Sequence, residues 1–285
     1  MIYTLYNPKS YNGHGKKDAL KLRKLLPGQM EFIDITGVDP VNIINRMKRK
    51  DEIVICGGDG TLNRFVNAVY DLKTEHRIRY FQAGSGNDFA RDVRSNFDGA
   101  LIELNQYIED LPYAIINGNN YRFLNGIGYG LDGYCCEKSD ELREKSKEKP
   151  VLDVSYSVLA LRGLLFDFVP RNAKVTVDGV TRSYTNVLLA PTMNGRYYGG
   201  GIMITPDQNR LDKDKTVSVA VVHDLEKLRA LTIFPLIYFG KHIKYEKYVE
   251  IIKGYDVKVE FDVPTPLQVD GETIKDVTMY QVKRD

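Results

Sequence analysis

The sequence predicts two domains: an α/β domain with three α/β/α layers, followed by a mainly antiparallel β-sandwich domain. Three observations support this fold class. Strands and helices alternate along the first segment of about 80 residues, which is typical of βαβ units. Residues 53–56 are continuously apolar, as expected of a strand that is buried on both faces of a parallel sheet. After residue 112, turn sequences separate short strands, which is typical of hairpins.

In the first domain, four strands are expected at residues 2–6, 32–35, 53–56 and 78–81. Three sets of apolar residues at helical spacing lie between or after these strands. They are Ala19, Leu22, Leu25 and Leu26; then Val41, Ile44 and Met47; then Leu62, Phe65, Val66 and Val69.

In the second half, Asn117-Gly118 and Asp178-Gly179 have the composition of tight hairpin turns. The strands around them are expected at residues 113–116, 121–124, 174–177 and 181–189, and further strands at 217–222, 248–252, 255–261 and 276–282. Two helices are expected, near residues 152–166 and 225–239.

Composition excludes several classes of protein. The 40 basic and 38 acidic residues nearly balance, and no basic stripe indicates a nucleic-acid partner. Three cysteines, two of them adjacent, make a poor disulfide framework and favour a reducing, cytoplasmic location. The four histidines lack metal-binding spacing, so no structural zinc site is expected. No apolar run reaches the length of about 20 residues that a membrane span needs.

The segment Gly57-Gly58-Asp59-Gly60-Thr61 is the leading candidate for a phosphate site, because it follows a buried strand and precedes a helix. Glycines allow the backbone to approach a ligand closely, and the N–H groups at a helix start favour an anion. Asp59 would repel a phosphate unless a cation lay between them, so it indicates Mg²⁺. A plain tight turn is the alternative interpretation, but helical periodicity follows the segment.

Two more loops follow strands of the same domain. They are residues 7–16, with Gly13 and Gly15, and residues 84–88, with Gly84 and Gly86. In a parallel sheet, all three loops would open at the carboxyl ends of strands, where ligands bind. The Walker and G-x-G-x-x-G patterns are absent, so ordinary P-loop and Rossmann interpretations are weak.

At this point the chain resembles the diacylglycerol kinase catalytic family, in particular its soluble bacterial lipid kinases. The resemblance runs through nearly the whole sequence in ordered blocks. The blocks are Asn7-Pro8-x-Ser10, Gly57 to Asn63, Gly84-Ser85-x-Asn87-Asp88 to Arg91, Phe123-Leu124-Asn125 through Asp132, Asn194-Gly195, Tyr198 to Gly201, Pro206, Gly240-Lys241-His242 and Asp270-Gly271-Glu272.

The resemblance implies an NAD kinase-like fold, with ATP between a nucleotide domain at residues 1–112 and a β-rich acceptor domain at residues 113–275. It also leads us to expect that a last strand, about residues 276–285, returns to the first domain. By matching positions, Glu272 is the general base, and Asp59 is the second catalytic residue through Mg²⁺. The expected ATP contacts are Asn7, Pro8, Lys9, Ser10, Thr36, Gly57, Gly58, Asp59, Gly60, Thr61, Leu62, Asn63, Gly84, Ser85 and Asn87.

The chain departs from the family pattern at three places near the nucleotide. Arg64 stands where the family usually has Glu, and Ser85 replaces a Thr but keeps the hydroxyl. The first loop is longer by one residue, Tyr11. Arg64 is the departure that bears most on activity, because it follows the Gly-Gly-Asp-Gly-Thr block directly.

A second, structural Mg²⁺ site of the family lies after Pro206. The resemblance implies Asp214 as its ligand, together with backbone oxygens of Leu211 and Thr216, while Asp212 is an alternative alignment of the same ligand. Here Lys215 replaces a Gly and Ser218 replaces an Asp of the family pattern, which makes the site degenerate.

The expected acceptor is a lipid that takes part in phospholipid metabolism, with diacylglycerol as the first candidate. The apolar segment 225–239 is followed by Lys241, Lys244 and Lys247, a combination that suits peripheral contact with an anionic membrane. A core helix followed by surface lysines is the alternative interpretation. Exposed strand edges in the β-rich half would permit a homodimer.

Two other functions are consistent with parts of the sequence. NAD kinases also use a Gly-Gly-Asp-Gly-Thr block, but the Asp270-Gly271-Glu272 ending and the triple glycine favour a lipid acceptor. Arg64 and the degenerate metal loop would also fit a nucleotide-binding protein with little kinase activity. A hydrolase is not indicated, because no G-x-S-x-G motif is present.

Overall fold

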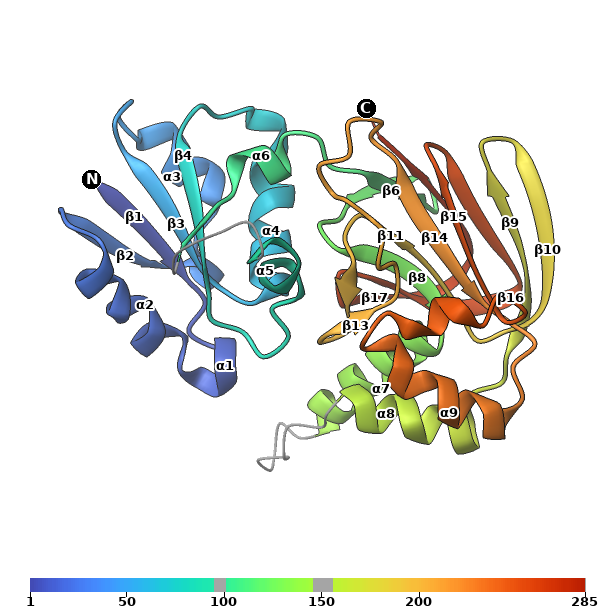
Figure 1. Ribbon diagram of the computed structural model, residues 1–285. Coiled ribbons are helices and arrows are strands. Elements are labelled where there is room, and N and C mark those ends of the chain that lie inside the picture. Colours follow the sequence, from blue (N-terminus) through green and yellow to red (C-terminus); the bar gives the residue numbers. More distant parts are fainter. Residues whose placement is uncertain (95–100, 146–155, 285) are drawn as a thin grey trace. The chain divides into compact units, whose positions relative to one another are not determined.

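The computed structural model describes residues 1–94, 101–145 and 156–284, which form two compact units (Figure 1). The first unit is Met1–Leu111 and the second is Pro112–Asp285. The first is an α/β domain with a parallel sheet, and the second is an antiparallel β-sandwich with helices, as the sequence predicted.

The first unit contains a sheet of five strands in the order β2-β1-β3-β4-β5. β1 (Ile2–Tyr6), β2 (Met30–Asp34), β3 (Glu52–Gly57) and β4 (Arg77–Gln82) are parallel, whereas β5 (Ile102–Glu103) runs antiparallel to β4. The four parallel strands therefore end at the same edge of the sheet, which places the loops that follow them together.

Helices cover both faces of this sheet. Ala19 and Leu22 of α2 (Gly15–Leu25) pack against Val54 and Cys56 on one face. The alternate residues of β3 point to the other face, against which α4 (Asp59–Val69) packs. The remaining helices are α1 (Ser10–Gly13), α3 (Pro40–Arg46), α5 (Asp88–Val93) and α6 (Asn105–Ile108), with short turns η1 (Ile35–Gly37) and η2 (Tyr70–Leu72).

The second unit is built on a long, mainly antiparallel sheet with the strand order β15-β14-β11-β8-β16-β17-β6-β7, to which β9 and β10 add through β16. The strands are β6 (Tyr113–Ile116), β7 (Asn119–Arg122), β8 (Gly126–Gly130), β9 (Arg171–Val177), β10 (Val180–Val187), β11 (Leu189–Met193), β14 (Val217–Val222), β15 (Val249–Gly254), β16 (Val257–Val269) and β17 (Glu272–Lys283); β12 (Tyr197–Tyr198) and β13 (Ile202–Met203) form a separate pair.

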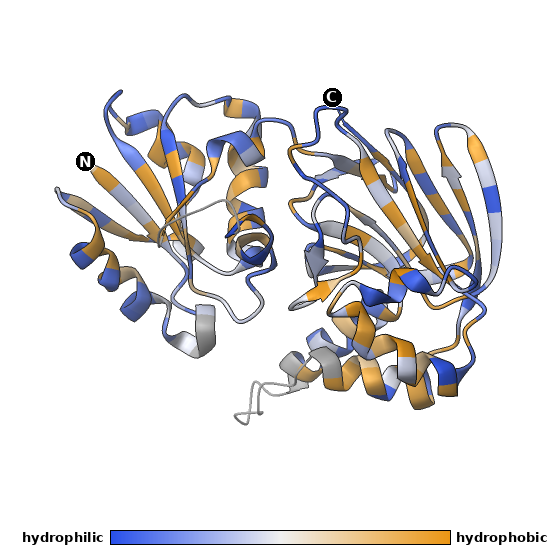
Figure 2. Ribbon diagram, viewed as in Figure 1, coloured by the Kyte–Doolittle hydropathy of each residue, from blue (hydrophilic) through white to orange (hydrophobic). Residues whose placement is uncertain are grey.

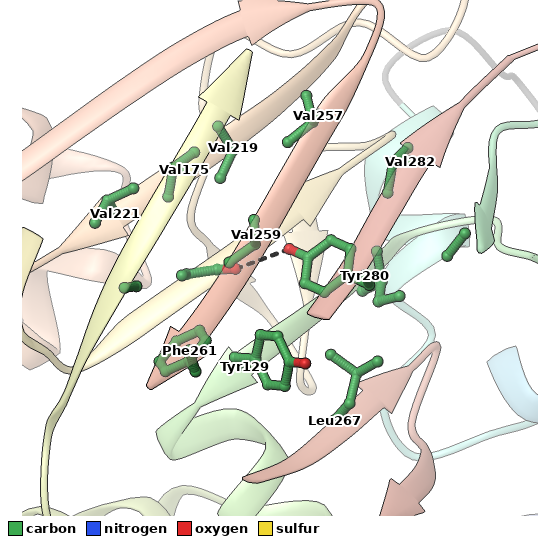
Figure 3. Close-up of a cluster of buried hydrophobic side chains, with 14 of the residues drawn as sticks. Tyr129, Val175, Val219, Val221, Val257, Val259, Phe261, Leu267, Tyr280 and Val282 are labelled. Carbon is green, nitrogen blue, oxygen red and sulfur yellow. Dashed lines mark hydrogen bonds between the residues drawn. The ribbon is translucent and has the colours of Figure 1, made fainter. Parts of the chain in front are cut away.

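The core of this unit is a cluster of valines and aromatic rings between the strands (Figure 3). Tyr129 lies against Phe261 and Tyr280, with ring centroids 4.4 and 5.4 Å apart. The buried hydroxyl of Tyr280 donates to the carbonyl of Ala190 at 3.0 Å, so the ring is buried without losing its hydrogen bond.

A second cluster joins the sheet to a layer of helices. These are α7 (Leu131–Lys145), α8 (Tyr156–Arg162), η5 (Gly163–Asp167), α9 (Lys227–Ile237) and η6 (Lys241–Lys244). Residues 152–155 of the helix expected near 152–166 lie outside the described residues. In the described part of the chain, no helix combines the length and the apolar character that crossing a bilayer requires.

Several strands differ from the sequence analysis, which did not predict β5, β8, β11, β12 and β13 as separate strands. β17 pairs with β16 and β6 inside the second unit, and does not return to the first sheet as expected for residues 276–285. β8 was not predicted, because three of its five residues are glycines, which have low strand propensity. Close packing explains these glycines: a Cβ on Gly128 would lie 2.6 Å from Pro191 Cα, and one on Gly130 would lie 2.4 Å from the carbonyl oxygen of Leu188.

We therefore expect Gly128→Ala to destabilise the second unit by about 1–3 kcal/mol, because the backbone of β11 cannot move away cheaply. Urea unfolding would measure the change. The control is Gly37→Ala, where an added Cβ meets nothing within 4 Å, and whose stability we expect to stay within about 0.5 kcal/mol of the parent. Equal stability of the two variants would contradict the packing argument.

Candidate active site

At the carboxyl edge of the first sheet, three loops are tied together by side-chain and backbone hydrogen bonds. Asn7, after β1, donates from Nδ2 to Oγ1 of Thr61 at 3.1 Å, which links the first loop to the start of α4. The Asn7 carboxamide oxygen accepts from the backbone N–H of Lys9 at 2.9 Å, which fixes the loop that continues through Pro8 and Ser10. The residue expected as an insertion, Tyr11, lies in α1.

Glycines allow these loops to pass one another at backbone distance. A Cβ on Gly84 would lie 2.5 Å from the Cα of Gly58, so the loops after β3 and β4 meet glycine on glycine. A Cβ on Gly57 would lie 2.6 Å from Cβ of Thr61, and one on Gly15 would lie 1.9 Å from the carbonyl oxygen of Asn7. The glycine pattern is thus required by packing within the loops, in addition to any role toward a ligand.

Asp59 joins two of the loops. Its carboxylate oxygens accept from the backbone N–H groups of Asp88 at 3.0 Å and Phe89 at 2.9 Å, so Asp59 caps the first turn of α5. Carboxylate oxygens are also ligands that Mg²⁺ accepts. The sequence analysis did not predict this capping role.

The third loop is closed by its own asparagine. Asn87 has φ +53°, and its carboxamide accepts from the N–H of Gly84 at 3.1 Å and donates to the carbonyl of Gly84 at 2.6 Å. Ser85 lies within this closed turn. Leu62 and Asn63 are buried in α4, behind the half-buried Gly60.

Thr36 follows β2, next to β1 in the sheet, and both its N–H and its hydroxyl donate to Asp34 Oδ1, at 2.9 and 2.7 Å. The structure therefore places all the predicted nucleotide contacts after the parallel strands of one sheet. Arg64 is exposed on α4, one residue beyond the Gly57–Asn63 block.

In the second unit, the carboxylate of Asp270 gathers three backbone N–H groups. Oδ1 accepts from Asn125 at 2.8 Å and Gly126 at 2.9 Å, and Oδ2 accepts from Leu124 at 2.5 Å. Asp270 belongs to the Asp270-Gly271-Glu272 block, and residues 124–126 belong to another block about 145 positions earlier. The sequence analysis assigned no role to Asp270.

A third block completes this arrangement. Asn194 donates from Nδ2 to the carbonyl of Leu124 at 2.9 Å, and the N–H groups of Asn194 and Gly195 both donate to the carbonyl of Asn125. The buried Arg210 donates to the Leu124 carbonyl at 2.8 Å and to the Asn125 side chain at 3.1 Å. Arg210 was also missed, because a lone arginine in a polar loop carries no local sequence signal.

Asp270 and Gly271 form a two-residue hairpin turn between β16 and β17, and Glu272 is the first residue of β17. Asp270 and Gly271 both have positive φ, +45° and +88°, and Gly271 N–H donates to Oε1 of the buried Gln268 at 2.9 Å. Next to Glu272, the hydroxyl of Thr273 donates to Asp140 of α7 at 2.8 Å. Glu272 is thus an exposed carboxylate on a hairpin held from both sides.

In the loop predicted to bind a structural metal, a side-chain amide lies among the backbone carbonyls. The carboxamide nitrogen of buried Gln208 lies 2.9, 3.4 and 3.5 Å from the carbonyl oxygens of Thr216, Asn209 and Asn194, and its oxygen accepts from the Ser218 hydroxyl at 2.6 Å. An amide donor therefore takes the place that the expected ligand Thr216 would offer to a metal.

Asp212, and not Asp214, supplies the carboxylate that holds this loop. It accepts from the Asp214 N–H at 3.2 Å and from the Thr216 hydroxyl at 2.7 Å, and these two donors lower its pKa. The expected ligand set of Asp214, Leu211 and Thr216 stays a prediction, with Asp212 as the alternative ligand. Among the described residues, no group of three or more His, Cys, Asp or Glu side chains is placed to hold a metal.

Comparison with known families matches both units. The model of the diacylglycerol kinase catalytic domain matches residues 1–116, and that of the YegS C-terminal NAD kinase beta sandwich-like domain matches residues 126–282. The chain belongs to the family that joins these two domains. The resemblance stated from the sequence blocks is confirmed.

Relatives cover most of the chain. The "putative lipid kinase YtlR" of Bacillus subtilis is 28% identical over 86% of this chain and 80% of its own length. The "diacylglycerol kinase" of Mycobacterium tuberculosis H37Rv is 24% identical over 91% and 84%. A solved structure of a "putative diacylglycerol kinase" from Bacillus anthracis has a TM-score of 0.68 at 21% identity, and covers 100% of this chain and 93% of that chain, which supports the fold.

Replacing Gln208 tests whether its amide, and not a cation, binds the carbonyls of this loop. We expect Gln208→Glu to lose about 3–5 kcal/mol of stability in EDTA, because a buried carboxylate would face three carbonyls. Mg²⁺ or Ca²⁺ should restore part of that loss, because oxygen ligands are what these ions prefer. Thermal unfolding with EDTA and with each ion would measure it.

The matched control is Gln208→Met, which removes the donor without adding charge and should show no rescue by either ion. The parent protein should unfold at the same temperature in EDTA and in Mg²⁺. A parent that is destabilised by EDTA would contradict our assignment of Gln208.

Asp132, at the start of α7, predicts a pH dependence. Burial raises its pKa from 3.8 to about 7, against the opposing effect of the Gly133 N–H and the Gln268 amide. The folded state therefore holds a proton that the unfolded state releases above its own pKa. Stability contributed by this group is lost as the pH rises from about 4 to about 7.

Asp132→Asn should remove this pH-dependent loss of stability. The free energy of unfolding of the variant, relative to that of the parent, should therefore increase from a pH of about 5 to a pH of about 8. Urea unfolding at the two pH values measures the difference. Asp262→Asn, at an exposed aspartate, is the control for the change in net charge. An unchanged pH slope in Asp132→Asn would contradict the assignment.

Proposed function

We propose that the protein is an ATP-dependent lipid kinase that transfers the γ-phosphoryl group to a lipid hydroxyl, with diacylglycerol or a related lipid as the acceptor. The observation that carries the proposal is the convergence of two distant sequence blocks on residues 124–126. The carboxylate of Asp270, two residues before Glu272, accepts from the N–H groups of this segment, and Asn194 donates to its Leu124 carbonyl. The turn anchored in this way carries Glu272, the carboxylate that the family pattern assigns as the base.

The loops of the first unit would bind the phosphates of ATP. Phosphoryl transfer demands mainly positioning and charge stabilisation, and closely packed glycine loops at the ends of parallel strands offer backbone N–H donors for both. The hydrogen bonds of Asn7, Asp59 and Asn87 hold these loops through partners within the protein. The loops are therefore preorganised.

The donor set near these loops fits a phosphate-bound Mg²⁺, which proteins often hold through one or two carboxylates together with substrate oxygens. Asp59 would hold it, because its carboxylate lies where the loops that follow β3 and β4 meet. When bound, the ion would neutralise charge on the transferred phosphoryl group.

Glu272 would act as the general base. A neutral lipid hydroxyl is a weak nucleophile, and a carboxylate within hydrogen-bond reach can accept its proton during transfer. The bond from the γ-phosphorus to the acceptor oxygen forms as its bond to the β–γ bridging oxygen breaks. ADP leaves, and the hydroxyl proton passes to Glu272.

The lipid-kinase names of the relatives from Bacillus subtilis and Mycobacterium tuberculosis support the choice of acceptor class. The decisive experiment is transfer of labelled γ-phosphate from ATP to diacylglycerol, other glycerolipids, a sphingoid base, an isoprenoid alcohol and NAD. We expect label in a lipid. Label in NAD alone would identify an NAD kinase, and ATP binding without any transfer would identify a nucleotide-binding protein.

We expect Glu272→Gln to lower kcat by about 10²–10⁴-fold, because the amide cannot accept the hydroxyl proton. ATP affinity should stay near that of the parent, because the nucleotide loops lie in the other unit. Labelled transfer and nucleotide titration measure the two quantities. Glu260→Gln, at a carboxylate on the same strand pair, is the matched control, and normal turnover by Glu272→Gln would exclude it as the base.

A further inference from the structure

Two neighbouring helical segments of the second unit each expose a row of large apolar side chains. Leu228, near the start of α9, is 80% exposed, and Phe239, two residues beyond its last residue Ile237, is 70% exposed. Along α8 and η5, Val158, Leu161 and Phe166 are exposed, the last at 76%. The row continues to Val169.

The two rows belong to one layer. The inward sides of both segments pack into the same cluster, to which Leu159 and Leu164 contribute from α8 and η5, and Ala230 and Ile233 from α9. Lys227 at the start of α9 donates to the carbonyl of Leu165 in η5 at 3.1 Å. In Figure 2 both segments are coloured largely hydrophobic. The core they share accounts for their inner residues but not for the exposed ones.

Basic side chains flank these apolar rows. Residues 225–248 contain five basic residues, Lys227, Arg229, Lys241, Lys244 and Lys247, but two acidic ones, Glu226 and Glu246. The ammonium of Lys241 lies 5.9 Å from the ring centroid of Phe239, so charge and apolar surface adjoin directly. In α8, the guanidinium of Arg162 pairs with Asp167 at 3.1 Å.

Exposed apolar groups rimmed by polar residues mark interaction sites in soluble domains. Lysines beside large apolar side chains match an interface whose headgroups are anionic and whose interior is hydrocarbon. A second copy of the chain fits less well, because a two-fold contact would bring the same lysines face to face.

We propose that Val158, Leu161, Phe166, Val169, Leu228 and Phe239 form a docking surface for an anionic lipid bilayer, with the lysines at its rim. The apolar side chains enter the headgroup region and the lysines attract the anionic lipid. The inference rests on the proposed function in one respect: a lipid kinase must reach an acceptor that resides in a bilayer. Binding itself is measured without turnover, so failure of docking and failure of the kinase proposal are separate results.

The experiment is sedimentation of the full chain with vesicles of phosphatidylcholine, with and without phosphatidylglycerol. The test variant carries Phe166→Ser, Leu228→Ser and Phe239→Ser. The matched control carries Val180→Ser, Tyr255→Ser and Met279→Ser, three other exposed large apolar residues of the same unit. A third variant, Lys241→Glu with Lys244→Glu, tests the rim.

We expect the parent and the control to bind anionic vesicles about tenfold more tightly than neutral ones. The test variant should lose about tenfold in binding to anionic vesicles, and the rim variant should lose the preference for them. Because the substituted side chains are exposed, we expect the variants to fold, and thermal unfolding measures whether they do.

Four results would overturn the proposal. The parent could bind both vesicle types equally or not at all, or the test variant could bind as the parent does. Light scattering could also show a parent dimer that the test variant converts to monomers, which would assign the surface to a second copy of the chain.

Discussion

The second unit depends on one set of hydrogen bonds. The carboxylate of Asp270 accepts from the backbone N–H groups of Leu124, Asn125 and Gly126. A hydrogen bond to a charged group contributes about 1.5–3 kcal/mol, so the three together outweigh the positive φ that Asp270 adopts. The carbonyls of the same segment accept from Asn194 and Arg210. Both the N–H groups and the carbonyls of residues 124–126 thereby take part in hydrogen bonds, and these bonds hold the turn that precedes Glu272.

In the first unit, glycines and one carboxylate likewise hold two loops together. Gly58 and Gly84 let two loops meet at backbone distance, and Asp59 closes the contact by capping α5. In both units an aspartate next to a glycine turns its side chain back onto backbone N–H groups of another loop. Both proposed catalytic regions therefore owe their order to polar groups satisfied within the protein, which is the condition for a preorganised site.

Much of this organisation could be predicted from the sequence. The apolar run at residues 53–56 and the Asn117-Gly118 and Asp178-Gly179 turns fixed the α/β unit and two hairpins, because local periodicity and positive-φ turns leave a direct trace. β8 left no such trace, because its glycines are required by close contact with Pro191 and Leu188, which are distant in the sequence. Likewise, nothing near Gln208 indicates that its amide faces three carbonyls, and nothing near Asp270 indicates its partners. The roles of these residues depend on contacts with residues that are distant in the sequence, and local sequence patterns do not indicate such contacts.

Asp270 holds the hairpin turn that carries Glu272, the proposed general base. The most direct measurement is labelled phosphoryl transfer by Asp270→Asn at saturating ATP, with amide hydrogen exchange at residues 124–126 on the same sample. An asparagine keeps one acceptor oxygen, so exchange at these amides should accelerate, and kcat should fall by about tenfold or more while ATP affinity stays that of the parent. Faster exchange at these amides with an unchanged kcat would contradict the account.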